Sequence, residues 1–206
     1  MSEFFEQLAR FTDNLACIEG ERRLTYSQLQ VAVDAKKGQL TQHLRNHDGR
    51  EPSKCLIVIV ASNSIPTLIN YLAALQLKHA IMFLAPENDL LNSNIAQDFS
   101  PDAVLKDDDV IVSTLASTPA LASHNGPVIR NDVAVLLSTS GSTGESKQVV
   151  LSYANLCANC ASICAYLPIE ESDISISTLP FHYSYGLSII NTHLAKGAAI
   201  LFTELS

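Results

Sequence analysis

A loop rich in hydroxyl groups and glycine lies between two apolar segments, residues 133–137 and 149–151. Five of the seven residues from 138 to 144 are serine or threonine, the other two are Gly141 and Gly144, and Lys147 follows shortly after. Glycines let backbone N–H groups converge on an anion without an obstructing side chain. Hydroxyl groups add hydrogen-bond donors for phosphate oxygens, and a lysine adds a compact positive charge. The loop is therefore predicted to bind a polyphosphate, and the β- and γ-phosphates of ATP suit it best.

The spacing of the glycines distinguishes this loop from the common P-loop. A P-loop has a longer interval between its glycines and a lysine directly after the second one. Here two residues separate Gly141 from Gly144, and Lys147 stands apart from both. The alternative interpretation is a Ser/Gly-rich hairpin turn, because this composition is common in loops. The density of phosphate-binding groups favours the phosphate loop.

The segments around the loop predict an α/β fold with a layered, mostly parallel sheet flanked by helices. The unbroken apolar run Leu56–Val60 is typical of a strand buried on both faces of a parallel sheet. Helical spacing over residues 64–77 and a second strand at Ala80–Leu84 complete a βαβ unit. The other expected elements are a helix at 3–11, a hairpin at 15–24, a helix that Thr25 and Gln28 cap and that ends before His47, a strand at 133–137, a helix at 152–167, a strand at 174–179, a helix at 187–194 and a strand at 198–202.

Two clusters of metal-binding residue types have simpler structural interpretations. Cys157, Cys160 and Cys164 have the spacing of one helix face, where the apolar stripe also runs, and no fourth soft ligand lies at a zinc-like distance. The acidic run at residues 107–109 would point to alternate faces of an extended chain, which favours a solvated turn. We therefore predict core cysteines, an acidic turn and no metal site in this chain.

Composition limits the class of protein. With 206 residues and 47% hydrophobic content the chain is too rich in core formers to be disordered. The net charge of −8 disfavours a nucleic-acid partner. The longest apolar run, residues 55–61, is far short of the ~20 residues that span a bilayer, and the acidic first residues do not read as a secretory signal. Five cysteines, an odd number, agree with a reducing compartment, so we expect a cytoplasmic protein without a membrane span.

The loop closely resembles the phosphate loop of the adenylate-forming superfamily, which includes acyl- and aryl-CoA synthetases, peptide-synthetase adenylation domains and beetle luciferase. The residues that match the superfamily pattern are Thr139, Ser140, Gly141, Ser142, Thr143, Gly144, Lys147, Val149, Ser152 and Asn155. Three positions depart from the pattern: Ser146 replaces a proline, Gln148 a glycine and Tyr153 a histidine.

Other segments support the same resemblance. Residues 24–29 resemble an early Leu-Thr-Tyr-x-Glu-Leu motif of the family, and residues 179–186 resemble its Pro-x-x-His-x-x-Gly segment. In that segment Tyr183 takes the position of an aromatic residue that borders the acyl site in relatives. Ser184 follows it, where relatives that activate amino acids have an aspartate. A weaker match covers residues 75–86, in which His79 replaces a frequent glycine.

The resemblance implies ATP-dependent activation of a carboxylic acid to an acyl-adenylate, followed by transfer to the thiol of coenzyme A or of a carrier protein. It implies that the ATP phosphates are held by Thr139, Ser140, Gly141, Ser142, Thr143, Gly144 and Lys147. The acid site would include Tyr183, Ser184 and Gly186. Because Ser184 offers no charge for a substrate amine, a fatty or aryl acid is favoured over an amino acid. The resemblance assigns no catalytic residue to this chain.

The resemblance also implies that the chain is the N-terminal part of a larger catalytic domain. Relatives are well over twice as long, and their adenine- and Mg²⁺-binding segment, ribose-binding aspartate and C-terminal lysine-bearing domain are not found before Ser206. We expect residues 1–166 to form a first α/β subdomain and 167–206 to begin the next. The Mg²⁺ ligand would then lie in the missing C-terminal part, which would be the partner of this chain. This chain alone would be inactive. An unpaired sheet edge would also allow a homodimer. The alternative is a naturally short, non-catalytic relative that binds a nucleotide or a partner.

Overall fold

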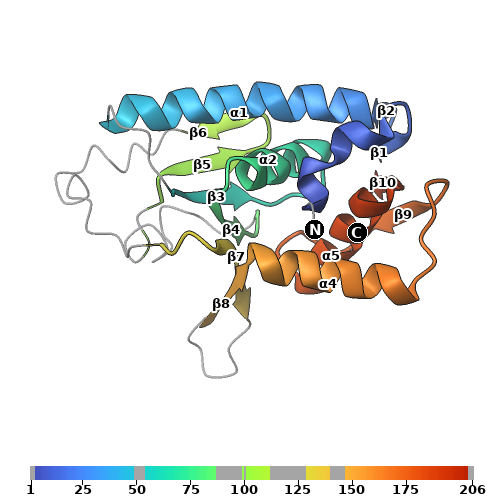
Figure 1. The fold of residues 1–206 in the computed structure, drawn as a ribbon. Helices are drawn as coiled ribbons and strands as arrows, with labels where there is room; N and C mark the ends of the chain where they lie inside the picture. The colour runs from blue at the N-terminus through green and yellow to red at the C-terminus, as the bar shows by residue number, and fades with distance from the viewer. Residues whose placement is uncertain are drawn as a thin grey trace.

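The computed structural model describes residues 3–48, 54–86, 99, 101–111, 129–139 and 147–203. These residues form two sheets flanked by helices, which confirms the predicted α/β class (Figure 1). The larger sheet has the strand order β6-β5-β3-β4-β7-β8. Its strands are β3 (Leu56–Val60), β4 (Ala80–Leu84), β5 (Ala103–Lys106), β6 (Asp109–Ile111), β7 (Val133–Thr139) and β8 (Lys147–Ser152).

The centre of the larger sheet is parallel, and its two edges are antiparallel. Strand β3 pairs in parallel with β4 and β5, and β4 pairs in parallel with β7. Ile57, Val58 and Ile59 are fully buried, as predicted for a strand covered on both faces. The edge strand β6, which the sequence analysis did not predict, returns antiparallel to β5 after a turn in which Asp107 has φ 51°. The acidic run therefore forms a hairpin turn.

The smaller sheet takes its strands from both ends of the chain. Its order is β2-β1-β10-β9, with β1 (Leu15–Glu19), β2 (Arg22–Thr25), β9 (Ile174–Ser177) and β10 (Ala199–Phe202). The predicted N-terminal hairpin is confirmed as β1 and β2, and β1 pairs in parallel with β10. The division of the chain at residue 166 into two subdomains stays a prediction.

Local sequence signals determine where the helices begin. The α-helices are α1 (Tyr26–Asp48), α2 (Ile65–Gln76), α4 (Tyr153–Tyr166) and α5 (Ser184–Lys196). At the start of α1, Gln28 N donates to Thr25 Oγ1 and Thr25 N donates to Gln28 Oε1, so the predicted capping box is confirmed. Helix α2 is capped by Ser64, whose hydroxyl oxygen accepts from Thr67 N.

Four predicted elements differ from the structure. Residues 3–11 form two 3₁₀ helices, η1 (Phe4–Glu6) and η2 (Leu8–Phe11), instead of one α-helix, because their buried aromatic side chains pack in an irregular turn against the core. Helix α1 runs on to Asp48. Helix α5 begins at Ser184, three residues before the expected start, and β9 ends at Ser177. Among the described residues, no helix combines the length and the apolar character needed to cross a membrane.

Aromatic side chains connect the two sheets. Phe181, which precedes α5 and is fully buried, lies 6.0 Å from Phe83 on β4 and 6.0 Å from Phe202 on β10, ring centroid to ring centroid. Tyr71 on α2 packs against the rings of Phe83 and Phe181 and donates a 3.0 Å hydrogen bond to Asn191 on α5. Helices α2 and α5 therefore meet between the sheets, and Phe181 holds both sheets to one core.

We expect Phe181→Ala to lower the free energy of unfolding by about 3–5 kcal/mol, because it leaves a cavity between the two sheets. Urea denaturation measures the change. Tyr185→Ala is the matched control: this neighbouring aromatic side chain is 67% exposed, and its loss should change stability by no more than about 0.5 kcal/mol. Equal effects of the two substitutions would show that Phe181 does not connect the sheets.

Candidate functional site

The predicted phosphate loop connects the two strands of an antiparallel hairpin. The register of β7 with β8 pairs Thr139 with Lys147, Ser138 with Gln148 and Leu137 with Val149. Gln148 Nε2 donates a 2.8 Å hydrogen bond to Ser138 Oγ across the pair. Ser140, Gly141, Ser142, Thr143 and Gly144 lie outside the described residues. The structure therefore places the two ends of the motif, Thr139 and Lys147, opposite each other at the end of the hairpin.

The hairpin carries the loop at the carboxyl end of a parallel strand. Strand β7 runs parallel to β4, and residues 133–137 are buried between the layers. Open α/β sheets bind their ligands just beyond the carboxyl ends of parallel strands. Figure 1 shows β7 and β8 extending from the body of the sheet, so that their shared end is set apart from the covering helices. The location agrees with a ligand-binding loop.

The Ser-x-x-Asn residues that follow the hairpin have a local structural role. Ser152 ends β8 and caps α4: its hydroxyl oxygen accepts from Asn155 N at 3.1 Å, and Asn155 Oδ1 accepts from Ser152 N at 2.9 Å. This reciprocal pair is a capping box with asparagine in the place of glutamate. Strand β8 therefore passes directly into α4, and the helix position is coupled to the hairpin.

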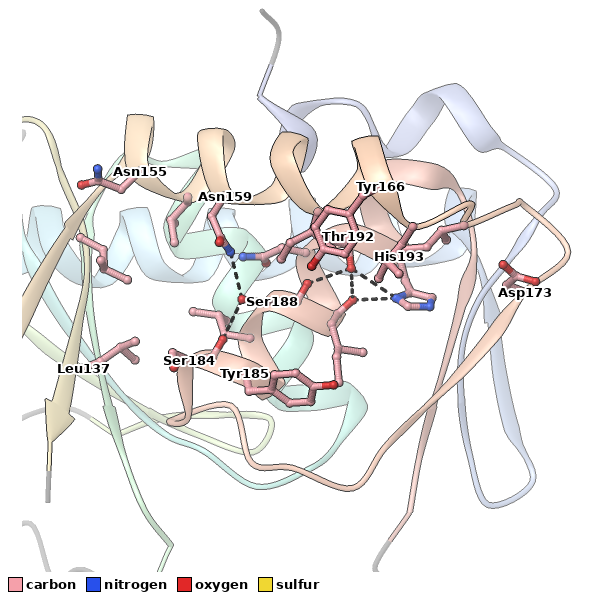
Figure 2. A pocket seen from close by; sticks show the side chains of 18 of the residues that line it. Leu137, Asn155, Asn159, Tyr166, Asp173, Ser184, Tyr185, Ser188, Thr192 and His193 are labelled. Atoms are coloured by element: carbon pink, nitrogen blue, oxygen red, sulfur yellow. Dashed lines mark hydrogen bonds between the residues drawn. The ribbon is translucent and has the colours of Figure 1, made fainter.

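A groove of about 910 Å³ lies between α4 and α5 (Figure 2). Leu137 and Leu151 of the hairpin contribute to its wall, together with Leu156 of α4 and Leu187 of α5. Uncharged polar side chains complete the lining, among them Asn155, Asn159, Ser184, Ser188 and Thr192. Asp173 and His193 also line it. Such a mainly apolar lining with a few polar groups is typical of small-molecule sites.

Hydrogen bonds connect the two helices across the groove. Asn159 Nδ2 donates to Ser188 Oγ at 3.0 Å, and Ser188 Oγ donates to Ser184 O at 2.8 Å, as the dashed lines in Figure 2 show. Thr192 Oγ1 donates to Ser188 O at 2.8 Å. Ser184 and Ser188 are four residues apart on α5 and lie on one face of the helix. The polar part of the lining is therefore held in place by hydrogen bonds within the protein.

The three residues predicted for the acid site have different surroundings. Ser184 lines the groove, whereas Tyr183 and Gly186 are not among the lining residues. Tyr183 is 57% exposed at the N-cap of α5, with its ring 4.5 Å from that of His182. At Gly186 a Cβ atom would lie 2.7 Å from Pro180 O, so this position needs a glycine because the helix packs closely on the preceding turn. Tyr185, which sequence analysis missed, does line the groove.

The cysteines of α4 lie on the side of the helix that faces the core, as predicted. Cys160 is buried, and its thiol donates to Asn191 O at 3.4 Å. Burial raises the pKa of Cys160 to about 12, so the thiol is protonated at neutral pH and is a poor nucleophile or metal ligand. Cys157 and Cys164 are half-buried beside the same core. The spacing is therefore explained by helix packing.

Comparison with known proteins identifies the family. The profile described as AMP-binding enzyme matches residues 4–205, which is nearly the whole chain. The chain belongs to the AMP-binding enzyme family. Its fold matches the N-terminal portion of adenylate-forming enzymes, as the resemblance of the loop implied: the crystal structure of apo MatB from Rhodopseudomonas palustris has a TM-score of 0.76 and 18% sequence identity over 98% of this chain and 45% of that one.

Two curated AMP-binding relatives illustrate the range of the family. A CoA ligase of Gibberella moniliformis is 28% identical over 98% of this chain and 38% of its own length. Bacitracin synthase 1 of Bacillus licheniformis is 26% identical over 99% of this chain and 4% of its own length. The chain thus spans less than half the length of each of these relatives and of MatB.

We expect Gly186→Ala to destabilise the protein by more than about 1 kcal/mol, because the new methyl group meets the backbone oxygens of Leu179 and Pro180 and displaces the first turn of α5. Gly38→Ala is the control: Gly38 lies within α1 with no atom near the position of a Cβ, and the change should stabilise the helix by about 0.5–1 kcal/mol. Thermal unfolding of both variants measures the difference. Stabilisation by both substitutions would contradict the close packing at Gly186.

Proposed function

We propose that this chain supplies the phosphate loop and part of the acid site of an ATP-dependent ligase that converts a carboxylic acid to an acyl-adenylate and transfers the acyl group to a thiol. The observation that carries the proposal is the register of Thr139 with Lys147, which closes the motif into a hairpin loop at the carboxyl end of β7. The thiol would be that of coenzyme A or of a carrier protein. All five cysteines are free thiols, which agrees with a cytoplasmic enzyme.

The role of the loop in this proposal is to hold the leaving group. A carboxylate oxygen of the acid forms a bond to the α-phosphorus of ATP, the bond from that phosphorus to the bridging oxygen breaks, and pyrophosphate leaves. The backbone N–H groups of Gly141 and Gly144 and the Lys147 ammonium would bind the β- and γ-phosphates and stabilise the charge that develops there. The hydroxyls of Thr139, Ser140, Ser142 and Thr143 would donate to the same oxygens. Mg²⁺ would neutralise part of that charge, and we expect its ligand in the remainder of the enzyme.

The groove between α4 and α5 supports a fatty or aryl acid as the substrate. Ser184 and Ser188 face it with uncharged hydroxyls, and leucine side chains of both helices and of the hairpin form its walls. A substrate ammonium group would lose its hydration there without gaining a carboxylate partner on α5. Tyr183 and Gly186 would contribute to the acid site at the N-terminus of α5. The acid would then lie close to the hairpin, because Leu137 and Leu151 belong to both structures.

An exposed apolar face of the smaller sheet supports the proposal that a further part of the enzyme packs against this chain. Ile18, Leu201 and Ile176 are in register across β1, β10 and β9 and lie on one face of the smaller sheet. Ile174 and Ile176 on the edge strand β9 are each 53% exposed. Because contiguous exposed apolar surface is unfavourable in water, we expect the remainder of the enzyme to cover this face, with this chain alone being catalytically inactive.

Lys147→Ala should weaken the binding of Mg-ATP to this chain by about tenfold or more, since a charge-assisted contact to phosphate is worth about 1.5–3 kcal/mol. An NMR titration with Mg-ATP measures dissociation constants into the millimolar range. Lys196→Ala, which removes the same charge from the last turn of α5, is the control and should leave the affinity unchanged. Equal affinity of the wild-type protein and Lys147→Ala would refute the assignment of this residue.

The double substitution Ile174→Ser with Ile176→Ser should reduce the fluorescence of a hydrophobic dye bound to the protein at least twofold, because it interrupts the exposed face. Val31→Ser, which removes an isolated exposed side chain of α1, should have no effect. Weak dye binding by the wild-type monomer would instead favour a self-contained, non-catalytic binding protein. Weak binding together with a dimeric sedimentation coefficient would favour a homodimer that covers this face.

A further inference from the structure

The end of the β7–β8 hairpin opposite the predicted loop is held by one lysine. Lys54 lies just before β3, and its ammonium donates to three main-chain carbonyls: Lys78 O at 2.7 Å, Asn131 O at 3.2 Å and Val133 O at 2.5 Å. The three acceptors belong to the turn before β4 and to the beginning of β7. Lys54 therefore joins β3, β4 and β7 at their amino ends.

Tyr153 holds the other strand of the hairpin at the same place. It is the first residue of α4, directly after β8, and its ring lies 4.7 Å from the Lys54 ammonium and 5.1 Å from the Lys78 ammonium. Its hydroxyl donates to His79 O at 2.8 Å, and its backbone N–H donates to Asp132 O at 3.0 Å. Two cations thus contact one buried ring, and Tyr153 is hydrogen-bonded through its hydroxyl to the segment before β4 and through its backbone N–H to the segment before β7.

The far end of the hairpin has fewer lateral contacts than the rest. Strand β7 is buried from Val133 to Leu137 and is registered against β4 at Ile81–Val135 and Met82–Leu136, in its middle; beyond Leu136 it is registered with β8 alone. Strand β8 is the edge of the sheet, with Val149 44% exposed and Val150 52% exposed. From Leu136 to Thr139 the strand rises by about 10 Å at ~3.3 Å per residue, so a tilt of about 10° where it leaves β4 displaces the far end by about 2 Å. The base contacts and the pairing with β4 therefore set the position of the far end together.

We propose that Lys54 and Tyr153 are positioning residues for the predicted phosphate loop: together they clamp the base of the β7–β8 hairpin and hold its far end in place for ATP. Neither residue touches the nucleotide in this proposal. The inference rests on the proposed function of the loop, whereas the clamp itself is a property of the hairpin. A displacement of about 1 Å in a binding or reacting group can cost up to about 100-fold in activity, which is why the base of the hairpin matters.

The charge of Lys54 makes its contribution to the stability of the protein depend on pH. The pKa of Lys54 is lowered to about 8, chiefly by burial; the Asp132 carboxylate raises it in part, and the Lys78 ammonium lowers it. His79 is neutral here, because burial lowers its pKa to about 4, and Glu3 and Glu6 pair with Lys78. Since the pKa of Lys54 is lower in the folded protein than in the unfolded chain, this group by itself gives the folded state a gain in stability as the pH rises from about 8 to 10. The buried thiols of Cys17, Cys55 and Cys160, whose pKa burial raises to about 12, lower the stability over the same range, so the gain is measured as a difference from a variant without Lys54. That gain must disappear when Lys54 is replaced by an uncharged side chain.

The test compares Lys54→Met with Lys54→Arg and with a lysine outside the hairpin. At pH 7 and low temperature, where every variant is folded, Lys54→Met should weaken Mg-ATP binding about tenfold, and Lys54→Arg, which keeps a cation on the ring, should stay within about threefold of the wild type. Tyr153→Phe, the milder variant, keeps the ring and loses the bond to His79 O, and we expect an intermediate loss. Lys37→Met is the control, because Lys37 also donates hydrogen bonds but lies on α1.

Hydrogen exchange tests the clamp without ATP. In Lys54→Met the amides of residues 135–137 and 149–151 should exchange about tenfold faster, and those of β1 and β10 should not change. Urea unfolding at pH 8 and pH 10 should show that the stability of the wild type relative to Lys54→Met is higher at pH 10 than at pH 8. Unchanged exchange in the hairpin, or a loss of stability with unchanged ATP affinity, would overturn the positioning role. If wild-type protein fails to bind Mg-ATP, the proposed function fails, and the exchange result still decides whether the clamp exists.

Discussion

The row of aromatic rings from Phe83 through Phe181 to Phe202 is the constraint on which the arrangement of the candidate site depends. Phe83 belongs to the larger sheet and Phe202 to the smaller one. Phe181 lies between them, immediately before α5, and Tyr71 adds a hydrogen bond from α2 to α5. The hairpin with the predicted phosphate loop belongs to the larger sheet, whereas α5 connects two strands of the smaller sheet. The position of the hairpin relative to α5 and the groove is therefore set in part by how these rings pack.

The two ends of the β7–β8 hairpin differ in their surroundings and in their composition. At the base, Lys54 and Tyr153 occupy a buried junction where carbonyl groups and an aromatic ring surround a cation. At the far end, Thr139 and Lys147 are paired in register, and the sequence between them is rich in serine, threonine and glycine. The polar groups at the base are paired with one another, which strengthens each bond in a low-dielectric environment. In the sequence, the far end is a run of small residues rich in hydroxyl groups and glycine, which is the composition that the proposed phosphate site requires.

Much of the fold could be predicted because its signals are local. The bounds of β3 and β4 agree with the apolar runs that predicted them, since a strand buried on both faces must be apolar at every position. The capping boxes at Thr25 and Ser152 connect residues three positions apart, so they depend on nothing distant. Errors occurred where distant contacts override local preference. The 3₁₀ helices at the N-terminus follow the packing of Phe4 and Phe5, and α5 begins early because Gly186 allows it to approach the turn at Leu179 and Pro180.

The sequence by itself determined the class of fold and the family, because these depend on residue types at short spacings that any folded form of the chain must keep. Only the tertiary structure decided which side chains share a site. It placed Ser184 and Tyr185 on the groove and left Tyr183 and Gly186 out of its lining. It also brought Lys54 beside Tyr153, although 98 residues separate the two in the chain. Such contacts depend on how sheets and helices pack, and that packing results from the burial of many side chains together, which no single motif encodes.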